Sequence, residues 1–518
     1  MTNAVRQVVV LGGGSAGWLT AALLAAEHGG ADAGALQISL IESPDTPAIG
    51  VGEGTWPSMR ESLQRIGLHE ADLVRECDAA FKQGSCFDGW VNGAAQDRYY
   101  HPFSLPQGYG DADLVGGWLT EGAGRPVRPF AECVSPQPHL CSERLAPKQV
   151  STPEFGAVAN YGYHFDAVKI GLLLRRHAVD QLGVRHILDH VTAVRSHDNG
   201  DIAALQTRGH GDIAGDLFID CSGLPSLLLG QHYGIALQSQ QQVLFNDSAL
   251  AAQVPYPSPD APLASATIAT AHAEGWTWDI GLPTRRGVGL VYSSAHTTTE
   301  AAERALRRHI QRSGGPAEVA APRHIRFTPG YRERFWHRNC VAVGLSSGFI
   351  EPLEASALAL VELSAAMIRD DMPAHRADMD IVARRFNDAF SYRWARIIDF
   401  LKLHYVLSQR DDSDYWRDHR RAESQPERLR ELLQLWRHRA PYRNDLFRIE
   451  EVFPAASYQY VLYGMGFKPE LAASRPPRLA RAQASFREVE TITRRMLGGL
   501  PRHRDLIQHI HGHGMLSV

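Results

Sequence analysis

The chain has 518 residues, of which 44% are hydrophobic and 21% charged, and its formal net charge is −4. This length predicts two or three folded units of ordinary globular composition, and the charge gives no reason to expect binding to nucleic acid or to a membrane surface. The 6 cysteines include no C-x-x-C pair and no zinc-binding spacing, so we expect reduced thiols, a cytoplasmic protein and no metal site.

The chain opens with a predicted β–α–β unit. Residues 8–11 (VVVL) are an apolar strand, the run WLTAALLAA is typical of a helix, and residues 36–43 (LQISLIES) form a second strand. The first apolar run lacks the basic flank and cleavage site of a secretory signal. The longest apolar stretch, at residues 357–368, is too short to span a bilayer. We therefore expect a Rossmann-like α/β fold with neither a signal peptide nor a membrane anchor.

The loop between the first strand and the helix has the dinucleotide fingerprint G-x-G-x-x-G. Its glycines permit a tight turn and the close approach of a pyrophosphate to the N–H groups at the start of the helix. An acid at the end of the second strand can accept hydrogen bonds from a ribose diol. The alternative, for the loop alone, is an accidental glycine turn. The predicted dinucleotide-binding residues are Gly12, Gly14, Ser15, Ala16, Gly17 and Glu42.

The middle of the chain mixes strand, turn and helix signals. Residues 57–82 are predicted to be helical, residues 83–160 irregular or sheet, and residues 165–183 an amphipathic helix. Residues 184–223 alternate strand and turn signals, with a hairpin turn at DNGD, and residues 340–345 are another apolar strand.

After Glu354 the sequence is mostly helical. We predict a boundary near residue 370, with a mixed α/β domain and inserted sheet elements over residues 1–370 and a mainly helical domain over residues 371–518. The fold class is therefore α/β (mixed α+β), with a Rossmann-like module followed by a helical C-terminal subdomain.

The dinucleotide that fits best is FAD. Only one dinucleotide loop occurs, whereas an enzyme that reduced its own flavin through a separate nicotinamide module would need a second one. Residues 216–223 (DLFIDCSG) resemble the second flavin motif of FAD monooxygenases, as does the strand-to-helix junction at residues 340–358, which contains Gly344. We therefore expect FAD that receives its reducing equivalents from outside.

Residues 275–283 (GWTWDIGLP) place two tryptophans and an isoleucine at alternate positions. In an extended strand Trp276, Trp278 and Ile280 share one face and form an apolar wall. The alternative is a core strand rich in aromatic residues.

Several motifs together resemble the flavin-dependent tryptophan halogenase family. They are GGGSAGW, GVGEGTWPSMRESLQRIG (50–67), FKQG (81–84), YGYHFDAVKIGLLL (161–174), DLFIDCSG, WTWDI and SGFIEPLEASAL (347–358). The resemblance implies that FADH2 from a partner flavin reductase, molecular oxygen and chloride or bromide yield hypohalous acid. It implies that this acid halogenates a small, indole-type aromatic in a separate pocket, and it leaves room for a homodimer.

The resemblance assigns two catalytic residues and a halide site. Lys82 holds the oxidant or becomes a haloamine, and Glu354 positions the oxidant and takes the proton from the arene. The alternatives are a surface lysine at a helix end and an acid that stabilises a helix N-terminus. The backbone N–H groups of Ser356 and Ala357 correspond to the halide site, where the family usually carries Thr-Gly.

The resemblance also explains the aromatic residues. Trp276, Trp278 and Ile280 match a wall that keeps the substrate away from the flavin, although the family continues this motif with Pro. In YYHPF (99–103), His101 and Phe103 match the aromatics that sandwich an indole; a loop that fills a core gap is the alternative.

Two other functions remain open from the sequence alone. One is an FAD-dependent aromatic hydroxylase, which needs neither Lys82 nor a halide site. The other is a non-catalytic carrier of reduced flavin. Within the halogenase interpretation, residues 439–466 lack the adjacent tyrosine pair with which family members clamp free tryptophan. We therefore expect indole or a larger indole-bearing molecule to be preferred. Because Ser356–Ala357 depart from the usual Thr-Gly of the halide site, we also expect bromide to be preferred over chloride.

Overall fold

The computed structural model describes residues 4–30, 34–45, 52–121, 128–471 and 476–516. These residues form two compact units, each assembled from three segments that lie apart in the sequence. The first unit comprises Met1–Asp78, Phe165–Gln240 and Phe327–Trp394, and the second comprises Ala79–His164, Gln241–Arg326 and Ala395–Val518. The boundary that we predict near residue 370 remains a prediction.

The first unit is built on a six-stranded sheet, in which five parallel strands follow the order β21-β12-β1-β2-β8 and β20 adds an antiparallel edge. The strands are β1 (Gln7–Leu11), β2 (Gln37–Glu42), β8 (Arg185–Leu188), β12 (Leu217–Asp220), β20 (Trp336–His337) and β21 (Cys340–Ala342). This order confirms the Rossmann-like arrangement. The carboxyl ends of the parallel strands meet at one edge, which is where such sheets bind ligands.

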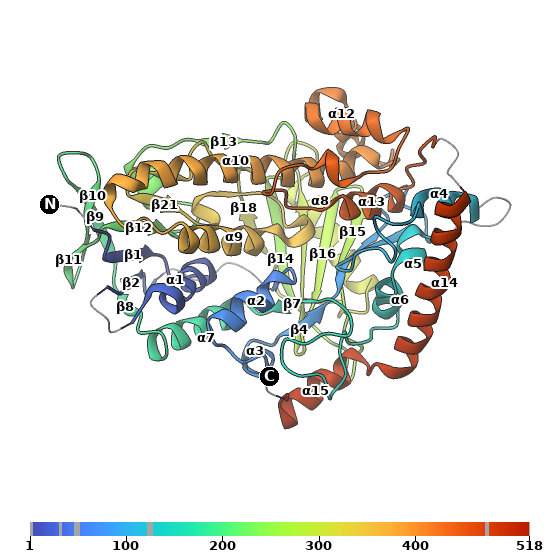
Figure 1. The fold of residues 1–518 in the computed structure, drawn as a ribbon, viewed down its shortest axis with the longest axis horizontal. Helices are drawn as coiled ribbons and strands as arrows, with labels where there is room; N and C mark the ends of the chain where they lie inside the picture. The colour runs from blue at the N-terminus through green and yellow to red at the C-terminus, as the bar shows by residue number, and fades with distance from the viewer. Residues whose placement is uncertain (1–3, 31–33, 46–51, 122–127, 472–475, 517–518) are drawn as a thin grey trace. The chain divides into compact units, whose positions relative to one another are not determined.

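Helices cover one face of this sheet. Helix α1 (Ser15–His28) packs against α7 (Ala167–Asp180) and α9 (Ser356–Asp370) (Figure 1). The amphipathic segment predicted at residues 165–183 is α7, and it begins where the Asp166 side chain accepts hydrogen bonds from the N–H groups of Val168 and Lys169.

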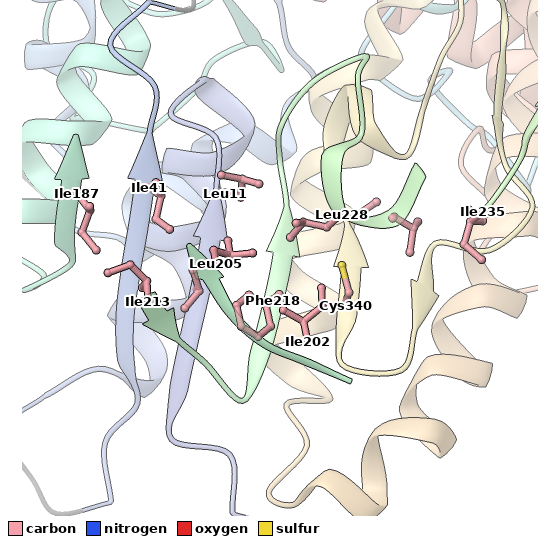
Figure 2. Close-up of a cluster of buried hydrophobic side chains, with 13 residues drawn as sticks. Leu11, Ile41, Ile187, Ile202, Leu205, Ile213, Phe218, Leu228, Ile235 and Cys340 are labelled. Atoms are coloured by element: carbon pink, nitrogen blue, oxygen red, sulfur yellow. The ribbon is translucent and has the colours of Figure 1, made fainter. Parts of the chain in front are cut away.

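A hydrophobic core joins the sheet to an antiparallel meander of β9 (Val191–Ser196), β10 (Ile202–Thr207) and β11 (Gly211–Ala214). The predicted DNGD turn connects β9 to β10. Figure 2 shows the side chains that meet, which include Leu11, Ile41, Ile187, Ile202, Leu205, Ile213, Phe218, Leu228, Ile235 and Cys340. This packing fixes the strands whose carboxyl ends carry the predicted dinucleotide loop.

The second unit is built on a seven-stranded sheet with the order β18-β14-β17-β16-β15-β5-β6. Its strands are β5 (Gly84–Asp88), β6 (Arg98–Pro102), β14 (Ser248–Pro255), β15 (Thr267–His272), β16 (Gly275–Gly281), β17 (Arg285–Tyr292) and β18 (Arg323–Arg326). Helix α8 (Thr299–Arg312) packs on β14, β16 and β17. The WTWDI segment is therefore extended, as predicted, and lies in strand β16.

The helices differ from the prediction in the first part of the chain and agree with it in the last part. The segment predicted as helical over residues 57–82 contains α2 (Ser58–Arg65), α3 (Glu70–Glu76) and strand β4 (Ala80–Lys82), which pairs with β7 (Gly162–Phe165). The described part of residues 83–160 contains helices as well as β5 and β6, namely α4 (Leu114–Glu121), α5 (Phe130–Val134) and α6 (Gln137–Ser142).

The chain after α9 is helical, as expected. Its helices are α10 (Arg376–Leu407), α11 (Asp414–His419), α12 (Glu427–Trp436), α13 (Ala455–Gly464), α14 (Pro476–Gly499) and α15 (His503–His513). None of the described helices combines the length and the hydropathy that a membrane span requires.

Candidate functional site

The predicted dinucleotide loop connects β1 to α1, and its glycines meet the steric demands of the fingerprint. Gly12 has a φ of +119°, and a Cβ atom there would lie 2.1 Å from the carbonyl oxygen of Cys221. A Cβ atom on Gly17 would lie 1.9 Å from the carbonyl oxygen of Gly12. At Gly14, the N-cap of α1, a Cβ atom would meet no described atom within 4 Å, and no side chain caps the helix. The loop therefore leaves an open space at the N–H groups of the helix, where a pyrophosphate fits.

Glu42 lies beside this loop at the end of β2. A Cβ atom on Gly13 would lie 2.3 Å from the Glu42 Cδ, so the carboxylate packs directly over the loop backbone. Its Oε2 lies 3.0 Å from the Nε2 of His186, yet this buried oxygen has no well-directed hydrogen bond from any described residue. An acceptor of this kind suits a ribose hydroxyl.

Gly344 follows β21 and brings a second turn to the same edge. Its φ is +75°, and a Cβ atom there would lie 2.8 Å from the Cβ of Ala16, in the first turn of α1. The turn after β21 therefore packs on the start of α1 because residue 344 has no side chain. Together with Glu42 and the open helix N-terminus, this arrangement fits a flavin dinucleotide.

Asp220, at the end of β12, is a residue whose part we did not predict. Its buried carboxylate accepts hydrogen bonds from the backbone and hydroxyl of Ser222, at 3.1 and 2.6 Å, and from the N–H groups of Leu228 and Leu229, both at 2.9 Å. It therefore fixes the turn after β12, next to Gly12. The DLFIDCSG motif could have indicated this role, because an acid at the end of a buried strand needs hydrogen-bond donors around it.

Glu354 lies in a strained turn directly before α9. Glu354 and Ala355 both have positive φ angles, of 64° and 55°, in the left-handed region that residues other than glycine rarely adopt. Only 6% of Glu354 is exposed, and the indole Nε1 of Trp56 donates a 2.8 Å hydrogen bond to its carbonyl oxygen. The position of Glu354 is therefore determined by this left-handed turn as well as by its location before the helix.

Ser356 and Ala357 form the first turn of α9, which no side chain caps. Ser356 is buried, whereas Ala357 is exposed. Two turns along the same helix, the buried Glu362 carboxylate accepts hydrogen bonds from the hydroxyls of Ser58 (3.2 Å) and Ser62 (2.7 Å) on α2. Burial raises the pKa of Glu362 to about 7.

Lys82 is the last residue of β4, and it is fully buried, with an exposed fraction of 0%. Its Nζ lies 5.2 Å from the centre of the Phe103 ring, in cation–π geometry. The Phe103 N–H donates to the carbonyl oxygen of Gln83, at 3.1 Å, so the chain after β6 is tied to the residue that follows Lys82. The structure thus brings Lys82 and Phe103 together, and Lys82 is not a surface lysine.

Two buried histidines surround the Lys82 strand, and sequence analysis missed both. His164 on β7 is diagonal to Lys82 across the strand pair, and its Nε2 lies 2.7 Å from the Oγ1 of Thr267. Burial, together with the charge of Lys82, lowers the pKa of His164 well below its usual value. His503 accepts a 2.9 Å hydrogen bond from the N–H of Phe81, and burial lowers its pKa to about 3. Both rings are therefore neutral near pH 7.

The residues of the predicted aromatic wall lie on strand β16. Trp276 and Ile280 are buried and Trp278 is partly exposed, while the Trp276 and Trp278 ring centres lie 6.4 Å apart. Gly289 is opposite Trp278 on β17, and a Cβ atom there would lie 2.1 Å from the Trp278 Cζ2. The second indole therefore lies over a glycine that leaves room for it.

His101 lies in a buried aromatic cluster at β6. Its Nε2 is 2.9 Å from the hydroxyl of Ser457 on α13, and its ring centre is 5.7 Å from that of Phe400. The series of ring contacts continues through His404 and Trp90 to Trp276, with centre distances of 5.5, 5.9 and 6.0 Å. The predicted substrate residue and the predicted wall thus share one aromatic core.

The predicted site residues form two groups, each within one unit. The first unit carries Gly12, Gly14, Ser15, Ala16, Gly17, Glu42, Gly344, Glu354, Ser356 and Ala357. The second unit carries Lys82, His101, Phe103, Trp276, Trp278 and Ile280. No group of three or more histidine, cysteine or acidic side chains suited to a metal ion occurs among the residues described.

Comparison with known proteins finds similar chains of nearly equal length. A sequence model of the family described as tryptophan halogenase matches residues 7–480. The 7-chloro-L-tryptophan 6-halogenase of Kutzneria sp. (strain 744) is 33% identical, over 98% of this chain and 99% of that protein. The structure of a tryptophan halogenase from Shewanella frigidimarina NCIMB 400 has a TM-score of 0.96 and 46% identity, covering 99% of both chains. A flavin-dependent halogenase from Xanthomonas campestris has a TM-score of 0.85 and 31% identity, covering 99% of both chains.

Proposed function

This chain belongs to the tryptophan halogenase family and is a flavin-dependent halogenase, and we propose that its substrate is an indole-type aromatic and that Lys82 and Glu354 carry the chemistry. The observation that supports these roles best is the complete burial of Lys82 beside Phe103. An ammonium at this buried place beside an aromatic ring can donate a hydrogen bond or a proton to a bound oxidant, and a hydroxylase needs no such group.

We infer that FAD binds at the β1–α1 loop of the first unit. The open N-terminus of α1 suits the pyrophosphate, and the Glu42 carboxylate suits a ribose hydroxyl. Bound reduced FAD would supply two electrons and two protons to oxygen, and the halide would supply two more electrons. With one proton from solvent, this gives hypohalous acid, water and oxidised FAD. Because the described residues provide a single dinucleotide loop, a separate flavin reductase would deliver the reduced flavin.

The Lys82 ammonium would act on hypohalous acid as a hydrogen-bond donor and then as an acid. Donation to the oxygen makes the halogen more electrophilic. As the carbon–halogen bond forms, the oxygen–halogen bond breaks and the oxygen leaves as water with the proton from Lys82. The neutral ring of His164 avoids a second positive charge near that ammonium.

Glu354 would complete the substitution by taking the proton from the halogenated ring carbon, which restores aromaticity. At the end of the reaction Lys82 has lost one proton and Glu354 has gained one. Exchange with solvent then restores the starting protonation state of both side chains. The backbone N–H groups at the start of α9, at Ser356 and Ala357, would hold the halide beforehand.

For the substrate, we propose indole or a larger indole-bearing molecule in preference to free tryptophan. By their descriptions, the Kutzneria relative acts on a chlorinated tryptophan and the Shewanella relative on tryptophan. Residues 439–466 of this chain, however, lack an adjacent tyrosine pair to clamp an amino acid. Such a clamp contributes charge-assisted hydrogen bonds of about 1.5–3 kcal/mol each. Bromide should be preferred over chloride because it is easier to oxidise. We also expect the replacement of the usual Thr-Gly by Ser356–Ala357 at the halide site to impair chloride binding more than bromide binding.

The test combines the purified protein with a flavin reductase, NADH, FAD, oxygen and indole, with and without bromide. We expect a monobrominated product, recognised by the bromine isotope pattern, that forms only with bromide. A hydroxylated product formed without halide would support the hydroxylase alternative instead. Equal mixtures of indole and tryptophan, then of bromide and chloride, test the preferences: faster turnover of tryptophan, or predominant chlorination, would contradict them.

A further inference from the structure

We propose that Trp56 is a positioning residue for Glu354, because its indole N–H holds the strained Glu354–Ala355 peptide in the orientation in which the carboxylate works. The inference rests on the proposed role of Glu354 as proton acceptor. It assigns a specific task to the tryptophan of the GVGEGTWPSM segment, which neither the flavin site nor the halide site uses.

The peptide between Glu354 and Ala355 is held at both ends. Its carbonyl oxygen accepts the 2.8 Å hydrogen bond from Trp56 Nε1, and its N–H donates a 3.0 Å hydrogen bond to the carbonyl oxygen of Pro352. A relaxation of Glu354 and Ala355 out of the left-handed region would move this peptide, break both hydrogen bonds and shift the Cα–Cβ bond of Glu354. The two hydrogen bonds oppose that relaxation.

The conformation at this turn needs such support. Two successive residues with a Cβ atom have φ angles of 64° and 55°, a conformation that persists only where the surroundings enforce it. No side chain caps the N-terminus of α9. The Trp56 hydrogen bond is therefore a side-chain contact that supports the left-handed turn from outside the helix.

Trp56 is itself firmly anchored to α9 through α2. The N–H of Met59 donates to the Trp56 carbonyl oxygen at 3.2 Å, which ties the tryptophan to the first turn of α2. From that helix, the hydroxyls of Ser58 and Ser62 donate to the buried carboxylate of Glu362 on α9. The segment from Trp56 to Ser62 thus contacts α9 twice, once at the strained turn and once two turns further along, so the indole donor has a fixed place.

The test replaces Trp56 by phenylalanine, which keeps an aromatic ring and removes the N–H donor. Trp336→Phe is the matched control, because its indole Nε1 donates to a backbone carbonyl, that of Arg338, at 3.1 Å in the same unit. Turnover is measured with indole and with indole deuterated at the carbon that is halogenated, under saturating bromide.

We expect Trp56→Phe to lower kcat about tenfold, the effect of one hydrogen bond, with the KM for indole unchanged. The deuterium isotope effect on kcat should increase, because a misplaced carboxylate makes proton removal limiting. Trp336→Phe should match the wild type in both. A Trp56→Phe enzyme with wild-type kcat and isotope effect would overturn the inference, and so would slower turnover without a larger isotope effect, which indicates a merely structural role.

Two further variants keep the outcomes distinct. If Trp56→Phe does not fold, benzothienylalanine at position 56, in which sulfur replaces the indole N–H, preserves the shape and gives the same two expected results. Glu354→Gln tests the premise: if it retains the wild-type kcat and isotope effect, the proposed role of Glu354 is wrong. If Glu354→Gln is slow with a large isotope effect while Trp56 variants are normal, only the inference on Trp56 fails.

Discussion

Replacing Glu362 by glutamine should stabilise the protein above pH 7 and have little effect near pH 4.5. Burial raises the pKa of the Glu362 carboxyl from 4.5 to about 7, although the hydroxyls of Ser62 and Ser58 lower it in part. Between these values the unfolded chain has lost the proton while the folded protein keeps it, so the free energy of unfolding falls as the pH rises. At about 1.4 kcal/mol per unit, the loss reaches about 3 kcal/mol by pH 8.

Glutamine removes this loss because it does not ionise, while its amide can still bond to both serines. The assay is guanidinium unfolding of both proteins at pH 4.5 and pH 8, with Glu27→Gln as a control for a half-exposed carboxyl on α1. The difference in the free energy of unfolding between Glu362→Gln and the wild type should be about 3 kcal/mol larger at pH 8 than at pH 4.5. For Glu27→Gln we expect no comparable change in this difference. Parallel pH dependence of wild type and Glu362→Gln would refute the reasoning.

Other predictions concern packing around the site. His503→Leu should cost about 1–3 kcal/mol in guanidinium unfolding, because it leaves a buried backbone N–H without its acceptor; an unchanged midpoint would contradict this. Gly289→Ala should displace the Trp278 indole, since the new Cβ would lie 2.1 Å from its ring, and a shift in Trp fluorescence with altered indole KM would report it. Gly17→Ala should lower thermal stability without flavin, whereas Gly14→Ala should keep that stability and weaken FAD binding in titration calorimetry; equal behaviour of the two would argue against the assigned loop geometry.

Local patterns were sufficient for the parts of the fold that depend on neighbouring residues. The glycine loop and Glu42 were predictable because a β–α–β unit places them at fixed spacing from the strands. The β16 strand was predictable because its large side chains alternate. In both places a short stretch of sequence determines which residues share a face or an edge.

The surroundings of the proposed catalytic residues were not predictable, because they come from distant parts of the chain. Lys82 ends a strand rather than a helix, since its backbone pairs with Gly162, 80 positions later. His503 reaches the same strand from α15, across 422 positions. The left-handed backbone at Glu354 and Ala355 was not predictable because neither residue is a glycine. The hydrogen bond from Trp56 was not predictable because it joins residues 298 positions apart.

The central claim is that Lys82 serves halogen transfer and not the oxidation of flavin. The most direct measurement compares wild type with Lys82→Met, which keeps an unbranched apolar side chain and removes the ammonium, while oxygen uptake and brominated indole are followed together. We predict that oxygen uptake with supplied reduced flavin stays at the wild-type rate while brominated product falls about 100-fold or more, as expected for a lost proton donor. Brominated product at the wild-type rate, or a loss of oxygen uptake in parallel with the product, would contradict the account.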